Sequence, residues 1–245
     1  VDTKTGAEFR KYESGMTPSN ALLTTRSAKD TFFPQSETLM NFKVDGKKIK
    51  VIDTRVECED FVVWGVRACD ARAFKVLDNV FLSEPVDSFY KNRRDHALIV
   101  SLACDRPAET CFCKTFGVDP ADPDCDIAAY KVDGFLYLDA KTEKGGKLLA
   151  SLENATESAD EKAVDDAKAK INERLSKLPL ANLKADAFGS GKTPKFFDAP
   201  EWVELSESCL GCGSCTFHCP TCQCYDIKDF DTGHGVIRHR CWDSC

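Results

Sequence analysis

Short apolar or alternating runs in the first half of the chain predict β-strands. "KIKVIDTR" (48–55) alternates and is rich in β-branched residues, while "DFVVWGVRA" (60–68) and "HALIVSLAC" (96–104) are continuously apolar. Continuous runs of this length suit strands that are covered on both faces. Residues 1–47 are polar, with one apolar stretch, "TFFPQSETLMNF".

A helix is predicted between the second and the third of these runs. Apolar side chains recur there at helical spacing, at Phe74, Leu77, Val80 and Phe81, and Asp70 is placed to cap the helix N-terminus. Strand, helix and strand in this order predict an α/β (or α+β) N-terminal domain with a small mixed sheet.

The middle of the chain predicts a strand pair and one long helix. "YKVDGFLYLD" (130–139) has the pattern of a hairpin around Gly134. Residues 158–178 form an amphipathic helix that opens on a capping box of Ser158 and Glu161. Its apolar stripe consists of Val164, Ala167, Ile171, Leu175 and Leu178.

Residues 186–200, "DAFGSGKTPKFFDAP", carry two glycines and two prolines and predict a linker. Within it, "GSGKT" is similar to the end of a phosphate-binding loop. The first glycine of that motif and a preceding strand are both missing, which disfavours nucleotide binding.

Composition places the chain among globular proteins and narrows its partners. Apolar residues make up 42% and charged residues 30% of the 245 residues, and no apolar run approaches the ~20 residues that span a bilayer. The net charge of −7 argues against a nucleic-acid or anionic-membrane surface, because phosphate binding needs a basic face. The first twenty residues lack the apolar core of a secretory signal. We therefore expect a cytoplasmic protein whose clustered cysteines are metal ligands or redox groups rather than disulfides.

Six of the 14 cysteines lie in "CLGCGSCTFHCPTCQC" (209–224). The residues that carry the signal are Cys209, Cys212, Cys215 and Cys219, followed by Pro220. They fit the spacing C-x2-C-x2-C-x3-C-P, with which bacterial ferredoxins bind [4Fe–4S] clusters. Gly211 and Gly213 permit tight turns that direct N–H groups at the sulfides. Zinc is the main alternative, although zinc sites usually use two C-x2-C pairs.

Cys219 has a special place in this motif, because the fourth cysteine of such a run ligates the other cluster in two-cluster ferredoxins. A second run of this kind is missing from the sequence. The remaining local cysteines are weaker candidates for ligands, namely Cys222, Cys224, Cys241 and Cys245. The alternative is that some of them are small buried apolar residues, or that they contact the ligands without binding the metal.

Four more cysteines are expected to converge at the carboxyl ends of the predicted strands. Cys69 follows the second run, and Cys104 ends the third and is followed by Cys111 and Cys113. Sites in open α/β sheets form at this edge, and the helix that starts near Asp70 would direct its positive end at thiolates there. An additional [4Fe–4S] site is the favoured interpretation. The alternative has Cys69 and Cys104 as buried strand-end residues, and Cys111 and Cys113 as a redox or zinc pair.

Charged residues near the cysteines refine this hypothesis. Arg67, Arg72 and Arg106 are expected to offset the negative charge of a thiolate-bound cluster. Cys58 and Cys125 lie in acidic surroundings. They are expected to be free thiols, because nearby carboxylates disfavour a thiolate.

With these motifs assembled, the chain resembles the beta, iron–sulfur subunits of cytoplasmic sulfhydrogenases and the A subunit of anaerobic sulfite reductase. The resemblance rests on "TFFPQSETLMNF", "GVRACDARAF", "LACDRPAETCFC", "FFDAPEWVELSESCLGCGSCTFHCPTCQCYDI" and "RCWDSC", which follow the family's order. It implies an electron-transfer subunit with two or more [4Fe–4S] clusters. Its partners would be an NAD(P)H-linked flavoprotein of the ferredoxin-reductase type, which carries FAD, and a catalytic subunit.

The resemblance also implies ligand roles and an organisation of the chain. It assigns ligation to the run from Cys209 to Cys219 and strengthens the case for Cys69, Cys104, Cys111 and Cys113. The expected organisation is an α/β domain with its own iron–sulfur site over 1–185, a linker over 186–200 and a ferredoxin-like [4Fe–4S] domain over 201–245.

The family usually begins before the point that matches Val1 and continues past "WDSC" to a second ferredoxin run. We therefore expect a chain that lacks material at both ends. The alternative is a natural chain whose ferredoxin part holds one cluster.

Two other functions remain open on the sequence. One is a self-contained sulfur or sulfite reductase with an open iron site on the N-terminal cysteines, and the other is a zinc-dependent binding module. No catalytic residue is assigned, because no Ser–His–Asp arrangement, phosphate loop or paired-carboxylate motif stands out.

Overall fold

The computed structural model describes residues 1–245 except 5, 20, 22–23 and 244–245. The strands are β1 (Asp2–Thr3), β2 (Gly6–Ala7), β3 (Ser36–Asp45), β4 (Lys48–Asp53), β5 (Phe61–Arg67), β6 (Ala97–Leu102), β7 (Ile127–Val132), β8 (Phe135–Ala140), β9 (Tyr225–Asp231) and β10 (Gly235–Trp242). The helices are α1 (Ala68–Phe81), α2 (Ser88–His96), α3 (Glu143–Ser151), α4 (Glu161–Ser176), α5 (Glu201–Ser206) and α6 (Ser214–His218). Short 3-10 helices are η1 (Ala28–Thr31), η2 (Cys113–Phe116), η3 (Glu153–Ala155) and η4 (Thr193–Phe196).

A small mixed sheet forms the centre of the fold, as the sequence predicts. Its order is β5-β6-β7-β8, with β5, β6 and β7 parallel and β8 antiparallel to β7. Helices α1 and α2 lie in the connection between the parallel strands β5 and β6. The predicted strand, helix and strand are therefore present, and α2 is an additional helix that the sequence did not predict. Strands β7 and β8 form the predicted hairpin around Gly134. The α/β class is therefore confirmed.

Strand β6 is covered on both faces, which explains why its sequence is continuously apolar. Ile99 faces a core that includes Phe74 and Leu77 of α1. Leu98 and Val100 face a second cluster that includes Leu148 and Leu149 of α3. On α4, Ile171 and Leu175 of the predicted stripe are buried against Ala121.

The predicted helix starts need correction. Helix α1 starts at Ala68 with Arg67 as its N-cap residue, and Asp70 lies in the first turn. Asp70 is therefore not the N-cap residue, and its carboxylate instead accepts from the Arg67 Nε at 2.6 Å. Helix α4 is capped by the Asp160 side chain, which accepts from the Lys162 N–H at 3.0 Å, so the capping box at Ser158 was wrong.

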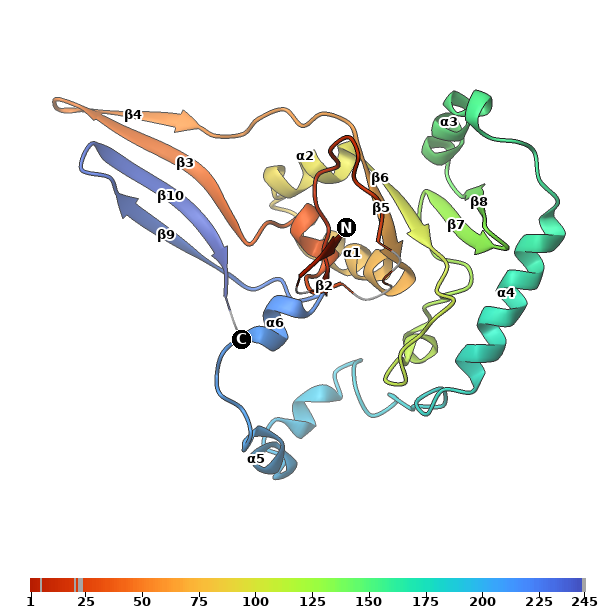
Figure 1. The fold of residues 1–245 in the computed structure, drawn as a ribbon. Coiled ribbons are helices and arrows are strands. Elements are labelled where there is room, and N and C mark those ends of the chain that lie inside the picture. Colours follow the sequence, from red (N-terminus) through yellow and green to blue (C-terminus); the bar gives the residue numbers. More distant parts are fainter. Residues whose placement is uncertain (5, 20, 22–23, 244–245) are drawn as a thin grey trace.

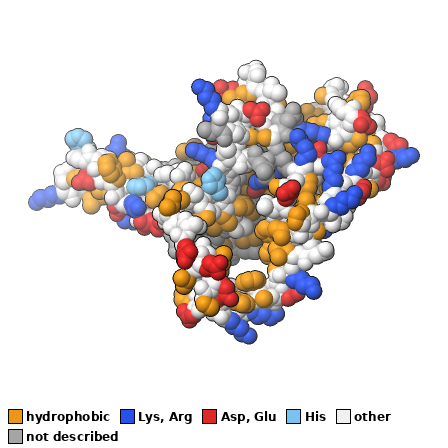
Figure 2. All heavy atoms as spheres, turned by 60° about the horizontal axis from the view of Figure 1, so that its bottom comes forward, with side chains coloured by type: hydrophobic (Ala, Val, Ile, Leu, Met, Phe, Trp, Pro, Cys, Tyr) orange, Lys and Arg blue, Asp and Glu red, His pale blue; other side chains and the backbone are white. Residues whose placement is uncertain are grey.

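A second sheet brings the two ends of the sequence together and projects from the body as an arm (Figures 1 and 2). Its order is β4-β3-β10-β9, and all its pairs are antiparallel. Strands from the predicted ranges 1–185 and 201–245 therefore share one sheet. The division of the chain at the predicted linker 186–200, which contains η4, stays a prediction.

Arg240 joins this sheet to the body. Its side chain is 2% exposed, its Nε donates to the Glu37 Oε2 at 2.8 Å, and its guanidinium also pairs with Asp87. Asp87 caps α2, because its carboxylate accepts from two backbone N–H groups at the start of that helix. The rings around the guanidinium are Phe33, Phe81 and Tyr225. Arg240 thus connects β10 to β3, α2 and the aromatic core.

In the described part of the chain, no helix has both the length and the apolar character needed to cross a membrane.

Replacing Arg240 by Ala should lower the free energy of unfolding by ~3–5 kcal/mol, because the mostly buried carboxylate of Asp87 would lose its cation and that of Glu37 would keep only Arg93. Urea unfolding followed by circular dichroism measures this loss. Arg238→Ala is the matched control, since Arg238 lies on the same strand and forms an exposed pair with Asp229 at 2.7 Å. It should cost about 0–1 kcal/mol. Equal losses in the two variants would contradict this account.

Candidate iron–sulfur sites

The N-terminal cysteines lie at the carboxyl ends of β5 and β6. Cys69 is in the first turn of α1, directly after β5, and Cys104 lies two residues after β6. Cys111 lies in the following loop and Cys113 begins η2. Because β5 and β6 are parallel, their carboxyl ends meet at the same edge of the sheet.

The structure brings these four cysteines together. The thiols of Cys69 and Cys113 share a hydrogen bond. Cys104 interacts electrostatically with both Cys111 and Cys69. Backbone bonds hold the loop, with the Cys104 N–H donating to the Pro120 carbonyl at 2.9 Å. The convergence predicted from the strand ends is therefore present in the fold.

The crowding of thiols has clear electrostatic effects. Burial, together with Cys111 and Cys69, raises the pKa of Cys104 to about 11. The hydrogen bond between Cys69 and Cys113 raises the pKa of the first and lowers the pKa of the second. Several of these thiols can therefore be ionised together only if a positively charged metal or side chain lies beside them.

Arg67 is such a neighbour, and the other two arginines differ from the expectation. The Arg67 side chain is mostly buried, pairs with Asp70, and interacts with Cys69 and Cys104. Arg106 contributes its backbone N–H to the Cys104 sulfur rather than its charge, and its guanidinium lies near Asp105. Arg72 is exposed on α1.

The donor set at this edge of the sheet fits an iron–sulfur cluster. Among the described residues, no three His, Cys, Asp or Glu side chains are placed to hold a single metal ion. A [4Fe–4S] cluster binds its cysteines at four different irons, so they are more widely spread than the ligands of one ion. Four converging thiols at a helix N-terminus, with Arg67 beside them, fit such a group.

The C-terminal run begins in an exposed loop between α5 and α6. Cys209, Cys212 and Cys215 are all exposed. Gly211 and Gly213 have φ of 66° and 71°, in the left-handed region, so glycine is needed at both turns. The Gly211 N–H donates to the Cys209 Sγ at 3.4 Å, which matches the expected direction of N–H groups at sulfur.

Two of these thiols are already biased toward the thiolate. The Cys212 Sγ lies 3.2 Å from the Ser214 Oγ, and this hydrogen bond lowers the pKa of Cys212. Burial opposes ionisation of Cys219, but hydrogen bonds with Thr221 and Cys222 outweigh it and lower the pKa of Cys219. Thiolates are the form that binds iron.

The weaker candidates lie near the same segment. Cys222 shares its hydrogen bond with Cys219, and Cys224 is exposed just before β9. Cys241 lies in β10 opposite Asp226. Cys245 lies outside the described residues. The ligand roles of all twelve cysteines remain predictions.

Lys29 is a buried residue of this region that the sequence analysis missed. It lies in η1 and is 1% exposed. Its Nζ donates to the carbonyl oxygens of Thr216 and Cys222, at 3.0 Å each. Burial lowers the pKa of Lys29, although Cys222 and Cys219 act in the opposite direction. Nothing in its sequence context relates it to residues almost 200 positions later.

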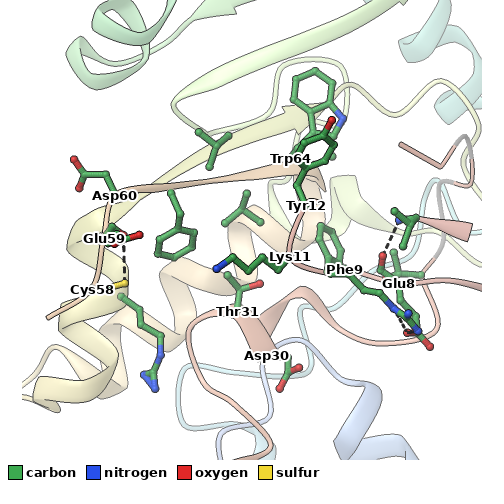
Figure 3. Close-up of a pocket in the computed structure, with 18 of the residues that line it drawn as sticks. Glu8, Phe9, Lys11, Tyr12, Asp30, Thr31, Cys58, Glu59, Asp60 and Trp64 are labelled. Carbon is green, nitrogen blue, oxygen red and sulfur yellow. Dashed lines mark hydrogen bonds and ion pairs between the residues drawn. The ribbon is translucent and has the colours of Figure 1, made fainter. Parts of the chain in front are cut away.

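A cavity with a volume of about 1400 Å³ has none of the candidate ligand cysteines among its described lining residues (Figure 3). Phe9, Tyr12 and Trp64 are among its lining residues, and Cys58 is the one cysteine among the lining residues described. Burial, with Glu59 and Asp60 beside it, raises the pKa of Cys58.

Cys125 lies in the core, where burial raises the pKa of its thiol. That Cys58 and Cys125 are free thiols stays a prediction.

Residues 208–245 match the family model of the 4Fe-4S dicluster domain. The chain is 34% identical over 213 residues to the sulfhydrogenase 2 subunit beta of Pyrococcus furiosus. The chain resembles a sulfhydrogenase beta subunit. This confirms the expected resemblance to sulfhydrogenase beta subunits. The dicluster match covers the whole C-terminal cysteine run.

The similarity covers 83% of this chain but 60% of the sulfhydrogenase subunit, so the chain spans less than two thirds of that relative. No solved structure matches the chain.

Thiol reactivity in the cluster-free protein should separate buried from exposed cysteines. Iodoacetamide reacts with the thiolate, so the labelling midpoint follows the pKa. Cys104 should reach half-maximal labelling near pH 11, because its pKa is raised to about 11. Cys212 should do so below the ordinary value of 9.0, because its pKa is lowered. Peptide mass spectrometry over a pH series measures both, and coinciding midpoints would contradict the described environments.

Proposed function

We propose that the chain is an iron–sulfur electron-transfer subunit of an oxidoreductase complex. The observation that carries this proposal is the C-x2-C-x2-C-x3-C-P run inside the matched dicluster domain. The similarity to a sulfhydrogenase beta subunit supports the same role. In this proposal residues 201–245 act as the ferredoxin-like part, and residues 1–185 hold a cluster of their own.

Each cysteine group has a defined part in the proposal. Cys209, Cys212 and Cys215 bind one cluster, and Cys219 ligates its neighbour, as in two-cluster ferredoxins. The additional cluster is bound by the four N-terminal thiols, namely Cys69, Cys104, Cys111 and Cys113. A bound [4Fe–4S] cluster accepts and releases one electron.

The chain's own groups tune such clusters in two ways. The Gly211 N–H points at the Cys209 sulfur and the Arg106 N–H at the Cys104 sulfur. Arg67 supplies a buried positive charge beside Cys69 and Cys104. Hydrogen bonds to sulfur and nearby positive charge both stabilise the reduced, more negative cluster, which raises its potential.

The proposed partners are a flavoprotein of the ferredoxin-reductase type, which binds FAD and oxidises NAD(P)H, and a catalytic subunit. The name of the relative describes it as one subunit of a sulfhydrogenase, which supports assembly into a complex. Exposed apolar side chains next to the cysteine run also favour contact with other protein surfaces. They are Phe197, Trp202, Val203, Leu205 and Leu210. Figure 2 shows hydrophobic and acidic side chains intermixed on the lower lobe, around α5.

Iron and acid-labile sulfide in anaerobically purified protein test the proposal directly. One [4Fe–4S] cluster contributes about four irons, so eight or more irons per chain are expected. Zinc without sulfide would refute the proposal.

Reduction with dithionite should bleach the visible absorbance of the clusters. Substrate turnover by the isolated chain would instead favour the self-contained reductase.

Cys111→Ser tests the N-terminal cluster separately. It should remove about four irons per chain, because one of the four ligands of that cluster would be lost. The matched control is Cys58→Ser, a cysteine that lines the separate cavity and should leave the iron content unchanged. An unchanged iron content in Cys111→Ser would rule out the N-terminal site while leaving the C-terminal one intact.

A further inference from the structure

Lys29 connects the N-terminal part of the chain to the C-terminal cysteine segment. Its Nζ bridges the carbonyl oxygens of Thr216 in α6 and Cys222, which lie on either side of Cys219. The Nζ also lies 4.1 Å from the ring centroid of Trp242. The amine therefore contacts three points on the segment that holds and follows the cluster run.

Placing this group in the interior is costly unless its hydrogen-bonding capacity is used, because an ammonium loses its water there. The two carbonyl oxygens and the electron-rich face of Trp242 replace that water. The surroundings hold the arrangement in place. The Trp242 Nε1 donates to the Phe33 carbonyl at 3.1 Å, and the Ser27 side chain accepts from the Lys29 N–H at 3.2 Å.

The charges that face Lys29 come mainly from cysteines. It interacts electrostatically with Cys222, Cys219 and Cys224, and with Asp30 on its own helix. Asp30 is engaged elsewhere, since its carboxylate accepts from the Gln35 N–H at 2.9 Å. The positive charge is thus directed at the part of the chain where iron is proposed to bind.

We propose that Lys29 is a positioning residue for the C-terminal cysteine segment (209–224) and that its charge raises the reduction potential of the cluster that this segment binds. This inference rests on the proposed function. When one electron from a reductant enters the cluster, the cluster gains one negative charge. A fixed cation in a low-dielectric interior stabilises that added charge more than the oxidised state, which raises the potential.

The test is a redox titration with dithionite under anaerobic conditions, followed by electron paramagnetic resonance. In Lys29→Gln, one cluster should titrate at a more negative potential than in the wild type. Lys29→Arg keeps the charge and should retain the wild-type potential. The matched control is Lys228→Gln, because Lys228 in β9 is exposed and paired with Asp226 at 3.4 Å. Solvent screens such a charge, so this variant should titrate like the wild type.

Iron content and circular dichroism keep the result interpretable if Lys29→Gln assembles poorly. Loss of iron in Lys29→Gln together with full iron in Lys29→Arg would support the positioning role, because Arg keeps a long cationic donor at this position and Gln does not. An unchanged midpoint in Lys29→Gln with full iron content would overturn it. So would a Lys29→Arg variant that behaves like Lys29→Gln. A wild-type protein without any iron–sulfur signal would instead refute the proposed function itself.

Discussion

The buried guanidinium of Arg240 is the interaction on which the arrangement of the chain depends. It lies among Phe33, Phe81 and Tyr225 and neutralises Glu37 of β3 and Asp87 at the start of α2. A cation in such a place is tolerated only because both carboxylates are fixed by their own elements. Through it, the last strand is held against the α/β core, and the cysteine segment before β9 is held with it.

A second constraint is the parallel pairing of β5 and β6. It places two chain reversals at one edge of the sheet, and each reversal carries a cysteine. The early start of α1 moves Cys69 into a turn where backbone N–H groups are free, and Arg67 remains extended beside it. The thiols are therefore gathered by the sheet's own geometry, although 44 positions separate Cys69 and Cys113 along the chain.

The elements that could be predicted from the sequence are those with a regular apolar pattern or a fixed residue spacing. Strand β6, the β7–β8 hairpin and the helices α1 and α4 were predicted because their buried side chains recur with the period of the element. Strands β3, β9 and β10 were missed because polar and charged residues interrupt their apolar positions, as in "YDIKDFD" and "GVIRHRCW". The N-caps were misplaced by two or three residues because residues that can cap a helix occur at neighbouring positions, as Ser158 and Asp160 do before α4.

The site was predicted to a similar extent and for similar reasons. The convergence of Cys69, Cys104, Cys111 and Cys113 followed from the rule on strand ends. Lys29 could not be found in this way. Its partners are backbone carbonyls, which carry no residue-specific signal, and they lie 187 and 193 positions away.

The pairing of β3 with β10 has a consequence for how the protein is made. Arg240 follows Glu37 by 203 positions, so the ribosome completes the α/β core long before β10 exists. Until then β3 and β4 form an isolated hairpin with an open edge, which is prone to pair with other chains. Closing the sheet also requires a contact of very long range, which slows folding. In the proposed function, a cluster inserted before that closure would bind a cysteine segment that is not yet held against the core, so stable metal loading should follow closure of the sheet.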